Sequence, residues 1–258
     1  MLAHLLHLPR AELFLSEKII LSDTKALFAE YISRRLRREP LSYILGEQEF
    51  WSLPFEVSPA VLIPRPETEN MIEICLQVVR DGNENFCGRI LDLGTGSGAI
   101  AIVLARELSQ AQVVAVDLSY SALSLARKNS ESHQFNKRLS FVQSDWLAGL
   151  GDQPVFDIVI TNPPYVEHDI LPSLQPEISF EPQLALDGGS LGIVEIKRLG
   201  RSIFSILKPG GWFFMEIGAD QAELVFEFFS SRQFDNINIY EDYAGLPRVF
   251  QARKPLSA

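Results

Sequence analysis

The chain has 258 residues, 47% of them hydrophobic, which suffices for one large domain or for one domain with a smaller companion. A formal charge of −10, from 23 basic and 33 acidic residues, argues against a dedicated nucleic-acid binder, which normally carries a basic face. No apolar run reaches membrane-span length and the first residues lack a basic leader, so we expect a cytoplasmic protein. Cys75 and Cys87 lack metal or redox spacing, and we expect both to be small buried residues.

The first 45 residues have helical periodicity. One predicted helix carries an apolar face made of Leu27, Phe28, Tyr31, Ile32 and Leu36. The basic run "RRLRR" (34–38) then falls at the carboxyl end of this helix. Such a run is typical of a solvated helix end, which the helix dipole favours, and less often of a contact with RNA or an acidic partner.

The stretch from 46 to 66 has a different character and is expected to connect two domains. Two aromatic-rich extended pieces flank Leu53-Pro54, which predicts a hairpin. Three prolines then keep the chain extended until a helix begins near Glu67. We therefore expect a helical domain (1–45), a hairpin connector (46–66) and a third region (67–258).

In this third region, short apolar strands alternate with helices. Strands are predicted at "RILDLG", "QVVAVDLS", "LSFVQSDW", "FDIVITNPPY" and "GGWFFMEIG", and two more end the chain in "NINIYEDYAGLPRVFQARK". The stretch "GIVEIKRLGRSIFSIL" is predicted to be helical. The alternation predicts an α/β fold with a mostly parallel sheet covered on both faces. Ligands of such sheets bind at the carboxyl ends of the strands, near the point where strand order reverses.

The loop "DLGTGSGAIA" (92–101) joins the first strand to a helix. Its glycines permit a tight turn, and the helix that follows offers free N–H groups to a ligand. Asp117 closes the next strand, where a carboxylate can accept hydrogen bonds from ribose hydroxyls. The letters Gly94-x-Gly96-x-x-Ala99 also satisfy the fingerprint of NAD binding. Glycines at every second position after Asp92 favour S-adenosylmethionine instead.

Two further strand ends carry candidate residues. After the third strand, Asp145 could accept from an adenine amino group, and Trp146 could pack on the ring or simply fill the core. After the fourth strand comes "TNPPYV" (161–166), whose adjacent prolines stiffen the backbone. The Asn162 amide oxygen and the Pro163 carbonyl are then two fixed acceptors, which suit an –NH2 group, and Tyr165 can pack on a planar target. This loop predicts methylation of an amide or nucleobase nitrogen.

Together these motifs resemble the amino-directed methyltransferases with an Asn-Pro-Pro-Tyr motif and, among them, the HemK/PrmC family. That family methylates the side-chain amide nitrogen of a glutamine in peptide chain release factors. The resemblance runs from about residue 34 to the end, and its pieces are "REPLSYILGEQEFW", "VSPAVLIPRPETE", "LDLGTGSGAIAIVLA", "SDW", "NPPYV", "FEPQLALDGG", "LKPGGWFFMEIG" and "YAGLPRVF". The connector "LIPRPETE" (62–69) is its most family-specific piece. The chain departs from the family in having fewer helical residues before "RRLRREP".

The resemblance implies a Rossmann-like class I S-adenosylmethionine-dependent methyltransferase domain with a seven-stranded sheet, a helical N-terminal domain that engages the protein substrate, and a hairpin linker. It assigns to the cofactor Gly94, Thr95, Gly96, Ser97, Gly98, Asp117, Trp146 and Asn162. It assigns to the substrate glutamine Asn162, Pro163, Pro164 and Tyr165. We expect no metal.

The expected reaction is methyl transfer to the N5 nitrogen of a release-factor glutamine, that of a Gly-Gly-Gln loop, by a monomer with no direct need for nucleic acid. A methyltransferase acting on a ribosomal-protein glutamine would share nearly every motif. A nucleic-acid adenine N6-methyltransferase should add a recognition domain or a basic face, and a non-catalytic S-adenosylmethionine-binding factor would not need Asn162 and Tyr165. A dehydrogenase would need a proton donor that nothing in the sequence supports. The sequence assigns no role to His168 or Glu181.

Overall fold

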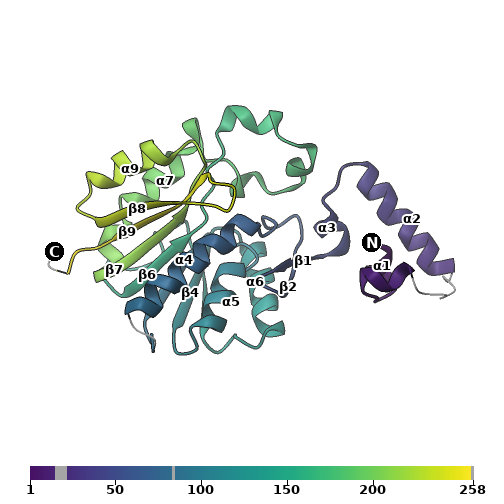
Figure 1. Cartoon of the computed structure of the whole chain (residues 1–258), viewed down its shortest axis with the longest axis horizontal. Helices are drawn as coiled ribbons and strands as arrows, with labels where there is room; N and C mark the ends of the chain where they lie inside the picture. The colour runs from purple at the N-terminus through teal and green to yellow at the C-terminus, as the bar shows by residue number, and fades with distance from the viewer. Residues whose placement is uncertain (15–21, 83–84, 257–258) are drawn as a thin grey trace.

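The computed structural model describes residues 1–14, 22–82 and 85–256 (Figure 1). The N-terminal part contains helices α1 (Leu2–Leu5), η1 (Arg10–Phe14), α2 (Ser22–Leu36) and α3 (Leu41–Leu45), followed by a hairpin of β1 (Glu47–Phe50) and β2 (Leu53–Glu56). The remaining strands are β3 (Arg89–Leu93), β4 (Gln112–Asp117), β5 (Leu139–Gln143), β6 (Phe156–Thr161), β7 (Leu207–Glu216), β8 (Asp235–Glu241) and β9 (Pro247–Arg253). The helices among them are α4 (Pro66–Gly82), α5 (Ala99–Glu107), α6 (Tyr120–Ser132), α7 (Val194–Gly200), α8 (Ile203–Ile206) and α9 (Ala222–Ser230). Between β6 and α7 lie the 3-10 helices η2 (His168–Ser173), η3 (Pro176–Phe180), η4 (Gln183–Ala185) and η5 (Ser190–Gly192).

The large sheet has seven strands in the order β5-β4-β3-β6-β7-β9-β8, as Figure 1 shows in part. β9 runs antiparallel to both of its neighbours, and the other pairs are parallel. The predicted mostly parallel α/β sheet is therefore confirmed. The strand order reverses between β3 and β6, which pair directly with Leu93 opposite Thr161. The loops that follow these two strands consequently leave the sheet side by side.

Alternate residues along the strands enter two cores, one on each face of the sheet. On the face covered by α4 and α5, Ile90 and Phe214 join a core with Met71 and Ile102. On the face covered by α7, α8 and α9, Leu91, Phe213 and Met215 join another. This alternation follows from the two-residue period of a strand, and apolar residues in nearly every position are typical of a sheet buried on both sides.

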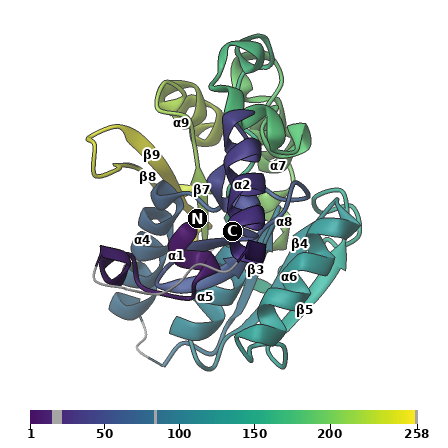
Figure 2. The ribbon, with the colours of Figure 1, turned by 90° about the vertical axis from the view of Figure 1, so that its right-hand side faces the viewer.

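The N-terminal helices lie beside the α/β region rather than on its sheet (Figures 1 and 2). Within the described residues, α2 has no buried side chain. Three residues of its predicted apolar face are exposed, namely Leu27, Ile32 and Leu36. The run 34–38 is neither a freely solvated end nor an open basic patch. Arg34 binds Glu39 at 2.5 Å, and Arg35 and Arg38 both bind Glu177 at 2.8 Å. Arg35 and Arg38 therefore link the end of α2 to the segment between β6 and α7, whereas Arg34 pairs locally.

The connector contains the predicted hairpin, but the expected turn position was wrong. Trp51 and Ser52 form the turn, and Leu53-Pro54 begins β2. Both turn residues have positive φ, 54° and 56°, as a two-residue hairpin loop requires. The Trp51 N–H donates to Glu69 of α4 at 2.6 Å, which helps to hold this backbone. Pro54 is tolerated because a two-stranded sheet consists of edge strands.

Two smaller expectations also need correction. The predicted helix over 192–207 is two short helices, α7 and α8, separated at Arg201 and Ser202. Gly200 ends the first of them, with Phe228 and Phe229 so close that a Cβ atom there would clash. Cys75 is buried as expected, but Cys87 is exposed. Within the described residues, no helix has the length and apolar character needed to cross a bilayer.

Asn129 of α6 fastens the hairpin to the α/β region. Its buried side chain accepts from the Glu56 N–H at 2.8 Å and donates to the Glu56 carbonyl at 3.0 Å and the Ser97 carbonyl at 2.9 Å. Removing one partner of a buried hydrogen bond leaves the other group desolvated and unpaired. We expect Asn129→Ala to lower the free energy of unfolding, measured by urea titration, by about 2–3 kcal/mol.

Lys128→Ala provides a matched control on the neighbouring residue. Lys128 forms an exposed ion pair with Glu56 at 2.6 Å, and exposed pairs contribute little. Its removal should change the free energy of unfolding by less than about 0.5 kcal/mol. Equal losses for the two variants would show that Asn129 does not act as described.

Candidate active site

A cavity of about 280 Å³ opens at the carboxyl ends of the central strands. This volume is near the lower end of those seen for small-molecule sites. Most residues predicted to bind ligand are in its wall, namely Gly94, Thr95, Gly96, Ser97, Asp117, Trp146, Asn162 and Pro164. In the described chain, Gly98, Pro163 and Tyr165 are not part of this wall. Leu118 and Leu184, two large apolar residues of the wall, are 46% and 57% exposed, as expected where a ligand provides the missing cover.

Hydrogen bonds to the end of β4 fix the start of the Gly-rich loop. The N–H groups of Gly94 and Thr95 both donate to the Val116 carbonyl at 2.9 Å. The Thr95 hydroxyl donates to the buried Asp92 carboxylate at 2.6 Å, and burial raises the pKa of Asp92 to about 7. Gly98 has a structural role, because a side chain there would meet Ala126 of α6 at 3.1 Å and its φ is 84°. The glycines thus shape the loop, and Gly96 faces open space.

Asp117 lies at the end of β4 with its carboxylate fixed on both sides. One oxygen accepts from the Gly96 N–H at 2.9 Å and the other from the Ser119 N–H at 2.8 Å. Burial raises the pKa of Asp117 above its ordinary value, and these backbone donors oppose that shift. A carboxylate has about four acceptor positions, so Asp117 can accept further hydrogen bonds from a ligand in the cavity.

Trp146 and Asp145, which follow β5, also line the cavity. A Cβ atom on Gly94 would lie 3.5 Å from the Trp146 ring and 3.9 Å from the Asn162 carbonyl oxygen, so these three residues are close neighbours. The Trp146 indole N–H donates to Glu195 at 2.6 Å, which fixes the ring. Asp145 lines the cavity but is paired with Arg198 of α7. Whether Asp145 contacts an adenine stays a prediction.

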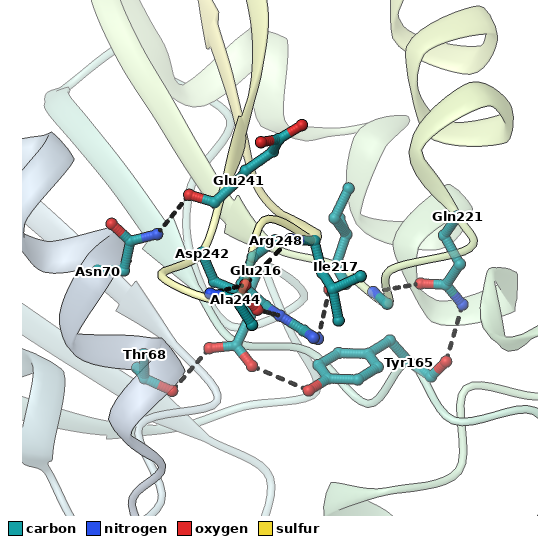
Figure 3. A network of polar contacts seen from close by, with 12 residues as sticks. Thr68, Asn70, Tyr165, Glu216, Ile217, Gln221, Glu241, Asp242, Ala244 and Arg248 are labelled. Atoms are coloured by element: carbon teal, nitrogen blue, oxygen red, sulfur yellow. Dashed lines mark hydrogen bonds and ion pairs between the residues drawn. The ribbon is translucent and has the colours of Figure 1, made fainter.

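Asn162 and Tyr165 are connected through one buried carboxylate, that of Glu216 at the end of β7. Figure 3 shows the contacts of Glu216 with Thr68 and Tyr165. The Thr68 hydroxyl donates to Glu216 at 2.6 Å, and the Tyr165 hydroxyl donates to its other oxygen at 2.9 Å. The Asn162 side-chain N–H2 in turn donates to the Thr68 hydroxyl oxygen at 3.1 Å. Burial raises the pKa of Glu216, while the two hydroxyls and the nearby Arg248 guanidinium oppose that shift. Tyr165 therefore uses its hydroxyl for an internal contact.

The segment after this loop folds back onto it. Gly188 donates its N–H to the Val166 carbonyl at 2.8 Å. Gly192 lies so close to the Tyr165 carbonyl that a Cβ atom would be 2.0 Å away, and its φ is 64°, so only glycine fits there. The Gln221 side chain, also in Figure 3, donates to the Tyr165 carbonyl at 2.8 Å and the Leu191 carbonyl at 3.1 Å. The predicted "NPPYV" and "DGG" motifs are thus parts of one backbone arrangement.

Glu181 and His168, which had no predicted role, have clear contacts. Glu181 is buried, pairs with Arg65 and accepts from the Ile63 N–H at 3.1 Å. It therefore ties the connector "LIPRPETE" to the segment that follows β6. His168 is exposed and binds Asp187 at 2.7 Å, which raises the pKa of His168. It is a surface residue of the loop rather than part of the cavity wall.

Thr68 and Glu216 are the site residues that sequence reasoning missed. A signal was present for both. Glu216 is an acidic residue that ends the apolar run "WFFM" (212–215) at the carboxyl end of β7, and Thr68 is a polar residue within the most distinctive connector motif. The sequence alone does not tell that Thr68 contacts both Glu216 and Asn162, because these contacts depend on the fold. The described residues contain no group of His, Cys, Asp and Glu suited to hold a metal ion.

Comparisons of the sequence identify two family models. Residues 74–204 match the methyltransferase small domain, and residues 1–46 match the PrmC N-terminal domain. The release factor glutamine methyltransferase of Koribacter versatilis is 42% identical over 98% of this chain and 88% of its own length. The protein of the same name from Vibrio cholerae is 39% identical over 96% of this chain and 86% of its own length.

Solved methyltransferase structures share the fold at low sequence identity. A methyltransferase from Pyrococcus furiosus has a TM-score of 0.58 at 17% identity, covering 91% of this chain and all of its own. The Thermus thermophilus 16S rRNA N2 G1207 methyltransferase, in complex with AdoMet and guanosine, also reaches 0.58 at 20% identity, over 81% of this chain and 49% of its own. The sheet order fits the methyltransferase fold, and the two relatives match this chain over nearly its full length. The chain belongs to the release factor glutamine methyltransferase family.

Proposed function

We propose that this protein transfers a methyl group from S-adenosylmethionine to the side-chain amide nitrogen (N5) of a glutamine in a peptide chain release factor, the glutamine of a Gly-Gly-Gln loop. The observation that carries the proposal is the position of Asn162, which lies beside Gly94 in the wall of one cavity. The names of its relatives support the choice of substrate. We further propose that it acts as a monomer in the cytoplasm.

The residues around the Gly-rich loop fit S-adenosylmethionine. Asp117 keeps acceptor capacity for two ribose hydroxyls, and residues 94–97 of the Gly-rich loop line the cavity, with no side chain at Gly94 and Gly96 to obstruct a ligand. Trp146 and Leu118 give the cavity an apolar surface that suits the adenine ring of S-adenosylmethionine. When bound, S-adenosylmethionine supplies a methyl group on a positively charged sulfonium.

The loop 162–165 suits the glutamine amide. An amide nitrogen is a weak nucleophile because its lone pair is delocalised, so orientation has to provide much of the catalysis. The Asn162 amide oxygen and the Pro163 carbonyl would accept its two hydrogens and hold the nitrogen toward the sulfonium. Pro164 lines the cavity beside them, and Tyr165, with its hydroxyl fixed on Glu216, can meet the planar amide with its ring.

No base is needed before the transfer. The glutamine nitrogen would form a bond to the methyl carbon while the bond between that carbon and the sulfur breaks. The electron pair of the broken bond would stay on the sulfur. Positive charge develops on the nitrogen, and the two preorganised carbonyl dipoles stabilise it. The methylated nitrogen is acidic and loses one proton to water.

The substrate assignment can be tested with labelled cofactor. We expect the pure protein, incubated with methyl-labelled S-adenosylmethionine and a release factor, to label one glutamine in the Gly-Gly-Gln peptide, as mapped by mass spectrometry. A release factor with that glutamine replaced by asparagine is the control and should stay unlabelled. Label in ribosomal protein or nucleic acid, with none in the Gln peptide, would refute the assignment.

Asn162→Ala removes one of the two acceptors. We expect kcat to fall by about a hundredfold or more, because the developing charge loses a preorganised dipole. The circular dichroism spectrum should be unchanged. Asn238→Ala, at an exposed position of β8, is the matched control and should keep full activity. Undiminished turnover in the Asn162 variant would rule out catalysis by orientation.

Asp117→Asn tests the cofactor site. The substitution removes the charge and places an –NH2 group against a backbone N–H, so the dissociation constant of S-adenosylmethionine should rise by about tenfold or more in calorimetry. Asp152→Asn, an exposed position, should leave it unchanged. If both variants bind S-adenosylmethionine as the unmodified protein does, Asp117 does not contact the cofactor.

A further inference from the structure

The polarity of the hydrogen-bond chain at Asn162 follows from a single buried charge. Glu216 is fully buried at the end of β7. β7 pairs with β6 so that Met215 lies opposite Thr161. The next residue of each chain segment, Glu216 and Asn162, therefore lies at the carboxyl end of one of two neighbouring strands. An ionised carboxylate can only accept hydrogen bonds. Its two hydroxyl partners, from Thr68 and Tyr165, must therefore donate to it.

This requirement passes from Thr68 to Asn162. The Thr68 hydroxyl has one hydrogen, which it gives to Glu216, so only its oxygen lone pairs face Asn162. Asn162 can satisfy them only with its –NH2 group, and it does so at 3.1 Å. The amide oxygen is then directed away from Thr68. The orientation of an amide is decided by its surrounding network, and here the network has one solution while Glu216 is charged.

The orientation matters for the reaction proposed above. A target –NH2 group needs an acceptor, and a reversed Asn162 would present donors to donors. We propose that Glu216 and Thr68 are positioning residues, which fix the Asn162 amide with its oxygen available to the substrate nitrogen. This inference rests on the proposed function, because it assigns to Asn162 the role of acceptor. It explains why a threonine of α4 and a glutamate of β7 meet beside the loop 162–165.

Protonation of Glu216 would remove the constraint. A neutral carboxyl can donate to Thr68, which can then donate to the Asn162 oxygen and let the amide turn over. The charged groups around Glu216 are Glu67 from α4 and Arg248 from β9, and Asp242 holds Arg248 at 3.3 Å. Burial, the largest influence, raises the pKa of Glu216. We therefore expect kcat to be maximal at pH values above that raised pKa and to fall as the pH decreases through it.

The decisive comparison is Thr68→Val against Thr68→Ser, measured with release factor and S-adenosylmethionine. Valine keeps the shape but offers no acceptor, whereas serine keeps the hydroxyl. We expect kcat of the valine variant to be about tenfold below that of the serine variant, because the productive orientation now buries an unpaired –NH2 group. The dissociation constant of S-adenosylmethionine should be the same in both, which a general loss of structure would not allow. Equal kcat values in the two variants would overturn the proposal.

Glu216→Gln decides the question if the valine variant does not fold. A glutamine is neutral and carries a donor, as a protonated carboxyl does, so it no longer forces the Asn162 amide into one orientation. We expect kcat of this variant to be lower than that of the unmodified protein at neutral pH and not to fall further as the pH decreases. In a variant that binds S-adenosylmethionine normally, kcat at neutral pH equal to that of the unmodified protein, or an unchanged fall of kcat at low pH, would overturn the inference. Failure of the unmodified protein to methylate the release factor would instead refute the proposed function itself.

Discussion

The direct parallel pairing of β3 with β6 is the constraint on which the site depends. It places Leu93 opposite Thr161, and the Thr161 hydroxyl donates to the Leu93 carbonyl at 2.7 Å inside the sheet. Because parallel strands end at the same edge, the Gly-rich loop and the Asn162 loop emerge as neighbours. Their separation is then determined by backbone geometry rather than by flexible side chains. A reaction that relies on orientation benefits from this, since small displacements are costly.

The connector "LIPRPETE" acquires a physical explanation from the same geometry. Ile63 and Arg65 hold the buried Glu181, so the connector fixes the segment that folds back over the loop 162–165. Three residues later, Thr68 reaches Glu216 and Asn162. One short stretch thus joins the hairpin, the segment after β6 and the site. A methyltransferase without this segment would have no use for that sequence, which accounts for its value as a family-specific signal.

Much of the fold and part of the site could be predicted because they depend on local pattern. Strand and helix alternation predicted the parallel sheet, and "NPPY" following a buried strand predicted the position of Asn162 at its edge. The partners of Asn162 could not be predicted, since Thr68 and Glu216 lie 94 and 54 positions from it and meet it only through the sheet order. The hairpin turn was misplaced for a similar reason. Trp51 and Ser52 adopt positive φ with help from Glu69, a contact that local propensity does not contain.

The arginine run 34–38 extends the same logic to the N-terminal region. A cationic helix end usually faces solvent, yet Arg35 and Arg38 converge on Glu177, four residues before Glu181. The segment between β6 and α7 is therefore held at Glu177 by the N-terminal helix and at Glu181 by the connector. Partly exposed ion pairs such as those of Glu177 contribute little free energy, whereas the buried Glu181 contact is costly to break. The connector thus determines where this segment sits over the site, and the arginines restrict how α2 lies against it.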